Sequence, residues 1–199
     1  MENYRSTYLN RDLRKLFPKL NITRYRRFLN MLARLSGSVV KKSDLARSLD
    51  ISEPTVKEYI EIADGTFLWR NLPSFEHSIE KSTVKMPRGH MRDSGLCHYL
   101  LKLSSLNDLE NDPILGSSFE SFVVEEIIKG IQATGLSPFT YHYYRTKNGV
   151  EIDCIIEGPK TVFPIEIKYG LSVPRRKLAN LENFVAKHKL EFGILINNA

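Results

Sequence analysis

The feature that most constrains the fold is a pair of apolar segments, 150–156 and 162–167, joined by a short Gly-Pro turn. Val and Ile dominate both segments, which predicts two neighbouring β-strands. Side chains two positions apart on a strand point the same way, so Glu166 and Lys168 are expected to project together. The hairpin brings Asp153 next to Glu166, because facing residues on adjacent strands are close neighbours. Two carboxylates placed in this way can share a divalent cation.

This constellation resembles the PD-(D/E)XK, or restriction-endonuclease-like, superfamily. Asp153 matches the acid on the first strand, Glu166 and Lys168 match the acid and lysine of the second, and Glu120 matches an acid on the preceding helix. Ile152 stands where the superfamily motif has proline. The resemblance implies that Asp153, Glu166 and Glu120 bind Mg²⁺ or Mn²⁺. It also implies that Lys168 orients the attacking water and stabilises charge on the scissile phosphate.

A purely structural interpretation of Glu166 and Lys168 is an exposed ion pair on a sheet face, worth at most about 1 kcal/mol. Asp153, Glu120 and the order of the predicted strands favour a nuclease-like site over that interpretation. Catalytic competence is a separate question, because endonuclease-like folds also occur as binding modules with degenerate sites.

A helix-turn-helix pattern follows an amphipathic helix predicted over 23–35. Ser43 is the expected N-cap of its first helix and Ser52 that of its second. Pro54 lies in the first turn of the second helix, where a missing N–H costs little. The segment 67–73 has the composition of wing strands.

The second half of the chain predicts an alternation of helices and strands. A helix beginning at Gly116 carries apolar residues at helical spacing: Phe119, Phe122, Val123, Ile127 and Ile131. Three strands are expected next, then a helix and a last strand, at 140–145, 150–156, 162–167, 174–189 and 192–196. The polar, turn-prone run 104–113 is the predicted domain boundary.

The predicted fold is therefore α+β or α/β. A winged helix-turn-helix domain with an N-terminal helical extension is expected over 1–105. A restriction-endonuclease-like domain, a mixed central sheet flanked by helices, is expected over 106–199.

Over nearly its whole length the chain is similar to the C-terminal region of prokaryotic AAA-type ATPases of unknown function. Residues 42–60, 85–96, 119–125 and the strand pair carry the likeness. The resemblance implies an ATPase domain N-terminal to this region in full-length relatives. This chain holds no Gly-x-x-x-x-Gly-Lys-Ser/Thr sequence, so it is not expected to hydrolyse ATP on its own. A truncated gene product and an excised segment are both compatible with that expectation.

Net positive charge is concentrated in the first part of the chain. Thirteen Lys and Arg face five Asp and Glu in residues 1–57, whereas ten face nine in residues 114–199. A basic region favours a polyanionic partner, and DNA is the expected one. The candidate phosphate contacts are Arg24, Arg26, Arg27, Lys42, Arg47, Lys57, Arg145 and Lys147. A merely solvated surface is the alternative, and three glutamates on the presumed recognition helix weaken the case for its insertion into a groove.

Cys97 and Cys154 lie far apart without CxxC spacing, so neither a disulfide framework nor a zinc site is expected. No apolar run approaches membrane-spanning length and the first residues lack a signal-peptide core, which predicts a cytoplasmic protein. Three hypotheses follow: a metal-dependent nuclease module, a non-catalytic module that binds DNA or protein, and a protein-binding scaffold. The oligomeric state stays open.

Overall fold

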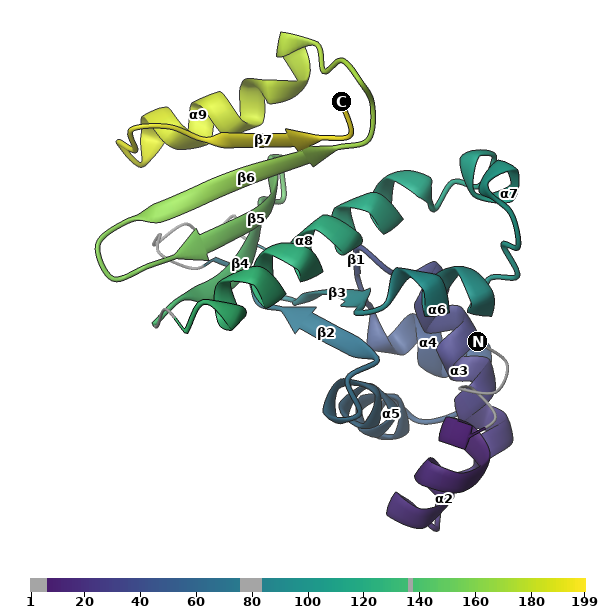
Figure 1. The fold of residues 1–199 in the computed structure, drawn as a ribbon. Coiled ribbons are helices and arrows are strands. Elements are labelled where there is room, and N and C mark those ends of the chain that lie inside the picture. The colour runs from purple at the N-terminus through teal and green to yellow at the C-terminus, as the bar shows by residue number, and fades with distance from the viewer. Residues whose placement is uncertain (1–6, 76–83, 136–137) are drawn as a thin grey trace. The chain divides into compact units, whose positions relative to one another are not determined.

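The computed structural model describes residues 7–75, 84–135 and 138–199 (Figure 1). The chain divides into two compact units, and both are discontinuous in sequence. The first comprises Met1–Arg70 and Gly89–Ile114, and the second comprises Asn71–Arg88 and Leu115–Ala199. The boundary expected after residue 105 falls inside the first unit, and 71–88 belongs to the second unit.

The first unit contains most of the helices. Their bounds are η1 (a π-helix) Tyr8–Asp12, α2 Leu13–Leu16, α3 Ile22–Arg34, α4 Lys42–Leu49, α5 Glu53–Gly65, α6 Ser94–Leu100 and α7 Leu106–Glu110. Strands β1 (Ser38–Val39), β3 (Arg88–Met91) and β2 (Trp69–Leu72) form a sheet in that spatial order. Helix α3 agrees with its prediction to within one residue at each end. Strand β3 lies in a stretch for which the sequence predicted no element, and α7 lies in the run expected to be turns.

Helix capping in the first unit agrees with one prediction and corrects another. The Ser52 side chain accepts a hydrogen bond from the backbone N–H of Thr55, so it caps α5 as predicted. The predicted Ser43 cap is wrong, because Lys41 holds the N-cap position of α4 and its side chain makes no capping bond. The backbone N–H of Asp44 donates to the Lys41 carbonyl at 3.2 Å, which places Ser43 inside the first turn.

The core of the first unit is aromatic. Tyr25 and Phe28 of α3 lie edge-on to Tyr59 of α5, with ring centroids 5.3 and 5.4 Å away, and all three are buried. Trp69 is also fully buried and lies against the backbone of Gly89, where a Cβ atom would come within 2.2 Å of its ring. Only glycine allows this approach, so strand β3 can lie directly on the tryptophan.

The second unit is built on a four-stranded sheet. Strands β4 (Thr140–Arg145), β5 (Glu151–Glu157), β6 (Val162–Lys168) and β7 (Ile194–Asn197) are neighbours in that order. The first three run antiparallel, and β7 is parallel to β6. The structure has strands in all four predicted regions. Helix α9 (Ala179–Lys187) and the 3-10 turn η2 (Arg175–Leu178) occupy the segment predicted as one helix.

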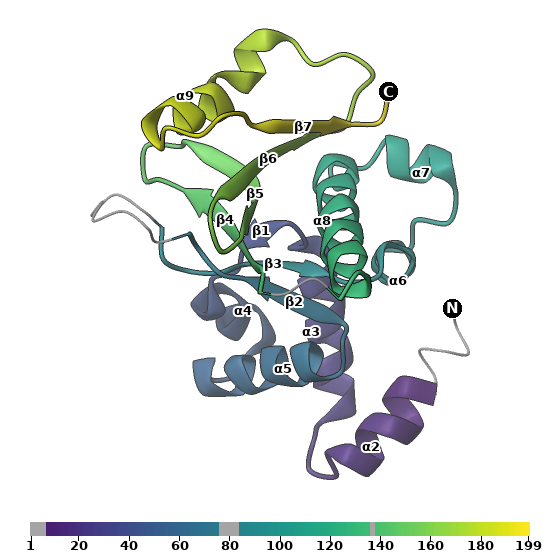
Figure 2. The ribbon, with the colours of Figure 1, turned by 60° about the vertical axis from the view of Figure 1, so that its left-hand side comes forward.

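Helices α8 (Leu115–Ala133) and α9 cover opposite faces of this sheet (Figure 2). Ile152 of β5 packs in a buried cluster with Leu181 and Phe184 of α9. The next residue, Asp153, shares an ion-pair partner with Glu120 of α8. Successive side chains on a strand point to opposite faces, so α8 lies over the face that carries the charged residues.

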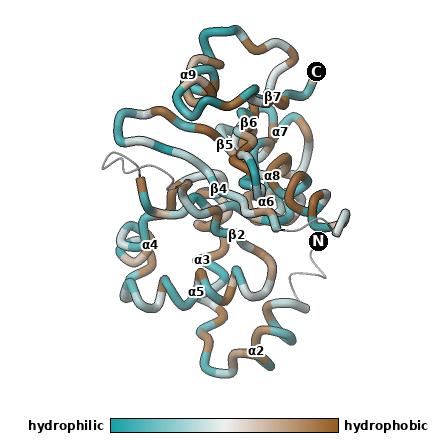
Figure 3. Tube along the Cα trace, turned by 90° about the vertical axis from the view of Figure 1, so that its left-hand side faces the viewer, coloured by the Kyte–Doolittle hydropathy of each residue, from teal (hydrophilic) through white to brown (hydrophobic). Residues whose placement is uncertain are grey.

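The buried side of α8 differs from the expected one. Val123 is buried as predicted, but Phe122 is 48% exposed and the fully buried apolar residue is Ile128. Small and polar side chains share the buried side, among them Ser118 and Ser121. Figure 3 shows hydrophobic segments along α8 and in the strands β5 and β6. Apolar spacing could not locate this side of the helix, because serines as well as hydrophobic residues line it.

Among the described residues, none of the helices combines the length and the apolar character that a membrane crossing requires.

Candidate functional site

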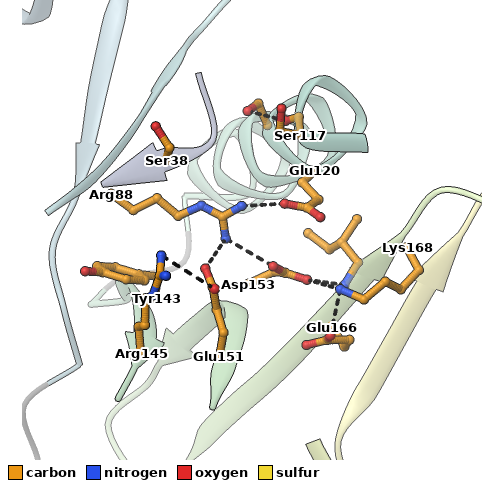
Figure 4. A network of polar contacts seen from close by, with 12 residues as sticks. Ser38, Arg88, Ser117, Glu120, Tyr143, Arg145, Glu151, Asp153, Glu166 and Lys168 are labelled. Atoms are coloured by element: carbon orange, nitrogen blue, oxygen red, sulfur yellow. Dashed lines mark hydrogen bonds and ion pairs between the residues drawn. The ribbon is translucent and has the colours of Figure 1, made fainter. Parts of the chain in front are cut away.

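The hairpin of β5 and β6 gathers three of the predicted site residues. Its register pairs Cys154 with Ile165, and one step further along the same register Asp153 lies opposite Glu166. Lys168 Nζ lies 2.7 Å from Glu166 Oε1 and 3.2 Å from Asp153 Oδ2. The lysine therefore bridges the two carboxylates (Figure 4). The three charged groups lie together, as the strand pattern requires.

Among the carboxylates of this cluster, Asp153 has hydrogen bonds to both of its oxygens. It is 4% exposed, and its Oδ2 accepts a hydrogen bond from the backbone N–H of Ile167 at 2.9 Å as well as from Lys168. Its Oδ1 accepts a hydrogen bond from Arg88 Nη1 at 3.0 Å. Both oxygens of Asp153 are thus already engaged by donors from the protein.

Arg88 is one of two residues of the cluster that the sequence analysis did not predict; Glu151 is the other. The Arg88 side chain is buried, and it forms ion pairs with Glu120 of α8 and with Asp153 and Glu151 of β5. The Nη1 atom lies 3.4 Å from Glu151 Oε1. Figure 4 shows the guanidinium between the helix and the strand, with Glu120 on one side and the β5 acids on the other. Asp153, Glu166, Lys168 and Glu120 are therefore brought together with two unpredicted partners.

A signal for Glu151 was present in the sequence. It precedes Asp153 by two positions on the same strand, so the two carboxylates share a face and require a nearby cation. No comparable signal identified Arg88, which is 65 positions away from Asp153 along the chain. Only the folded chain shows which of the many basic residues supplies that cation.

The segment that leads into Arg88 is attached to strand β4. The backbone N–H of Val84 donates to the Arg145 carbonyl at 2.8 Å, and the Tyr143 hydroxyl donates to the Met86 carbonyl. Arg145 also lies 3.9 Å from Glu151 through its guanidinium. These contacts tie the chain on both sides of Lys85 to the sheet, so the position of Arg88 follows from the fold of the second unit.

Burial and neighbouring charge raise the pKa of two of the acids. For Glu166, burial and then the charge of Asp153 raise the pKa to about 7, against the opposing effect of Lys168. For Glu120, burial and then Asp153 also raise the pKa, while Arg88 and Lys168 oppose the change. Burial is the larger cause for both acids, and the neighbouring cations only partly oppose the rise in pKa.

The two cations stay protonated. Burial lowers the pKa of Lys168, but Asp153 and Glu166 together outweigh it, and the net direction is upward. Burial also lowers the pKa of Arg88, but the charges of Asp153, Glu120 and Glu151 raise it by more, so the net change is upward. Two permanent positive charges therefore stand among the carboxylates.

The arrangement does not fit a divalent cation as it stands. Within the described parts of the chain, no group of three or more His, Cys, Asp or Glu side chains is placed to hold a metal ion. Both oxygens of Asp153 and the Oε2 atom of Glu120 accept hydrogen bonds from Arg88 or Lys168 instead. One atom departs from this pattern: Glu166 Oε2 is buried and has no hydrogen-bond partner among the described residues. The expectation of bound Mg²⁺ or Mn²⁺ stays a prediction.

The predicted DNA-contacting residues lie at the surface of their own units. Arg24, Arg26 and Arg27 of α3 are exposed, as are Lys42 and Arg47 of α4, Lys57 of α5 and Lys147 after β4. Two of these form loose surface ion pairs: Arg47 lies 3.9 Å from Asp44, and Lys57 lies 3.7 Å from Glu61. Arg145 is only partly exposed and belongs to the charged cluster.

The comparisons identify two families of unknown function. Residues 1–107 match the family described as "Domain of unknown function (DUF8612)", and residues 115–199 match "Domain of unknown function (DUF4143)". Two curated relatives are similar: "Uncharacterized protein Mb2031c" of Mycobacterium bovis and "Uncharacterized protein Rv2008c" of Mycobacterium tuberculosis. Each is 33% identical over 167 residues, which is 84% of this chain and 37% of the relative. The chain therefore spans little more than a third of the length of these relatives.

No solved structure matches the chain. The first family match covers more than half of the sequence. The chain therefore belongs to the DUF8612 family, with a region similar to DUF4143 as its second part.

Proposed function

We propose that the chain is a DNA-binding module that joins a winged helix to a nuclease-like domain, as the C-terminal region of an AAA-type ATPase. The element order α3, β1, α4, α5, β2, β3, with β3 between β1 and β2, supports the winged helix, because that order is typical of the motif. In the second unit a helix, three antiparallel strands, a helix and a parallel strand follow one another, which supports the endonuclease-like fold. The relatives are long enough to hold a further domain.

Two functions can use the charged cluster. Hydrolysis of a phosphodiester is favoured by the gathering of Asp153, Glu166, Glu120 and Lys168, whose carboxylate oxygens are the ligands that Mg²⁺ and Mn²⁺ prefer. Binding without hydrolysis is favoured by Arg88, which already neutralises the same carboxylates. We place binding without hydrolysis first, because Asp153 would have to give up Arg88 before it could coordinate a metal.

In this proposal the residues of the cluster have a structural role: they stabilise the fold of the second unit. Asp153 holds Lys168 and Arg88 in place and links β5 to the backbone of β6 through Ile167. Contact with DNA is made by the exposed basic side chains, among them Arg24, Arg26 and Arg27 in the basic first part of the chain. Such contacts read phosphates and carry no sequence information of their own.

The test combines retardation and cleavage of one plasmid-derived duplex. We expect the wild-type chain to retard the duplex, with an affinity that falls steeply between about 50 and 200 mM salt, and not to cut it in Mg²⁺ or Mn²⁺. Asp153→Ala and Lys168→Ala are the comparison variants, with circular dichroism as the check that they fold.

Each other outcome decides between the hypotheses. Cleavage by the wild type that both variants lose would overturn binding without hydrolysis and establish the nuclease. Absence of any salt-dependent retardation would contradict DNA binding, and the protein-binding scaffold would be the remaining hypothesis.

A further inference from the structure

Arg88 stands where several acids from different elements meet. Its guanidinium contacts Glu120 from α8 and both Asp153 and Glu151 from β5, and its side chain is 6% exposed. Carboxylates that converge on one buried point need a positive charge there, because an uncompensated buried charge is strongly unfavourable. In this protein that charge comes from an arginine.

The remaining charges of the cluster do not make Arg88 redundant. Lys168 contacts Asp153 and Glu166, and Arg145 is 3.9 Å from Glu151, but within the described chain neither forms an ion pair with Glu120. Without the guanidinium, Asp153 Oδ1 and Glu120 Oε2 no longer have the donor that joins them. Two hard oxygen atoms from two elements would then face the same vacated volume.

A second observation concerns the Lys168 end of the same cluster. Glu166 is 5% exposed, and its Oε2 has no hydrogen-bond partner among the described residues, although its other oxygen binds Lys168. An unpartnered buried carboxylate oxygen next to Asp153 is a further hard ligand. The guanidinium occupies Asp153 Oδ1 and Glu120 Oε2, and with it in place no three acids of the described chain are arranged to hold a metal ion.

We propose that Arg88 is a built-in counter-ion that excludes divalent cations from the carboxylates Asp153 and Glu120, and that its removal creates a site for Mn²⁺ or Mg²⁺. This inference deepens the proposed function, since it concerns the same cluster and gives a physical cause for binding without hydrolysis. A guanidinium and a divalent cation cannot both bind Asp153 Oδ1, and at about 4 Å their repulsion is large even at an effective dielectric constant of about 20.

The test measures binding of Mn²⁺ alone to the full chain by isothermal titration calorimetry. Arg88→Met removes the charge but keeps much of the length, and Arg88→Lys is the matched control that retains a cation. We expect Mn²⁺ to bind Arg88→Met at least about 100-fold more tightly than the wild type or Arg88→Lys, because the cation that occupies Asp153 Oδ1 is gone and only Lys168 remains. Adding Asp153→Asn to Arg88→Met should abolish the gain.

Stability gives the second readout. Arg88→Met should have a lower thermal midpoint than the wild type in EDTA, and Mn²⁺ should raise it, because a ligand that binds only the folded state stabilises it. The wild type should not respond to Mn²⁺. If Arg88→Met does not fold in EDTA, recovery of the fold in Mn²⁺ supports the proposal.

Several results would overturn it. Equal Mn²⁺ affinity in the wild type and Arg88→Met would show that Arg88 excludes nothing. Tight binding that survives Asp153→Asn would place the ion elsewhere. Failure of both Arg88→Met and Arg88→Gln to fold even with Mn²⁺ would show that the metal cannot replace the guanidinium. Retardation of DNA is measured separately. Its absence would contradict the proposed function, but the result for Mn²⁺ binding would still stand.

Discussion

At the scale of single residues, the cluster illustrates how burial changes what a charged group does. Lys168 and Arg88 are bridging groups, each in contact with at least two carboxylates, so neither resembles a solvated surface charge. The sequence predicted the convergence of Asp153, Glu166 and Lys168, because strand periodicity and a short turn determine it. It could not predict Arg88, because that contact depends on tertiary structure and no local pattern encodes it.

Both thiols provide a prediction at this scale. Burial raises the pKa of Cys97 and of Cys154 to about 12, and both are free and buried. Since the thiolate is the reactive form, neither should react with a disulfide reagent at about pH 8 while the chain is folded. Thiol titration should give no fast reaction in buffer and two reacting groups in denaturant. A fast reaction of either thiol in buffer would contradict this burial.

At the scale of elements, the sequence was most informative where local rules dominate. The four strands of the second sheet and the helices α3 and α5 are rich in the residues that favour them, and α5 also has its cap. Strand β3 was missed because Arg88, Gly89 and His90 have little strand propensity, and its place depends on close packing against Trp69. The short α7 was missed because its capping residues also favour turns, with Ser105 and Asp108 capping each other.

The two candidate N-caps give a prediction with an internal control. Ser52→Ala removes the oxygen that accepts from the Thr55 N–H and should lower the free energy of unfolding by about 1 kcal/mol. Ser43→Ala is the matched control, because Ser43 lies inside α4, where alanine is well tolerated, and it should change stability by less than about 0.5 kcal/mol. Urea unfolding monitored by circular dichroism measures both. Equal losses would show that Ser43 also caps its helix.

At the scale of the whole molecule, charge distribution gives the expected partner. The basic excess of residues 1–57 coincides with the helices of the first unit, where Arg24, Arg26 and Arg27 are exposed. The second unit is close to neutral, and two of its acids, Asp153 and Glu166, are buried in the charged cluster. The sequence indicated this asymmetry. It could not indicate that residues 71–88 belong with the second unit, because that membership depends on contacts with a strand far along the chain.

The arginines of α3 give a prediction for DNA binding. Replacing Arg24, Arg26 and Arg27 by alanine should weaken binding and reduce the slope of log affinity against log salt by about 0.9 for each phosphate that is no longer neutralised. The charge-matched control replaces Arg175, Arg176 and Lys177, which are exposed in the second unit. Fluorescence anisotropy at several salt concentrations measures the slopes. The same reduction in both triple variants would indicate a general charge effect with no preferred surface.

The division of the chain into two units has a practical consequence for the design of shorter fragments. The region similar to DUF4143 begins at residue 115, whereas Arg88 lies in the strip 71–88 that folds with it. A fragment cut at the family boundary would keep every acid of the cluster and lack the arginine that neutralises them. Metal affinity measured on such a fragment would describe the truncation, and only a version that retains 71–88 reports on the intact protein.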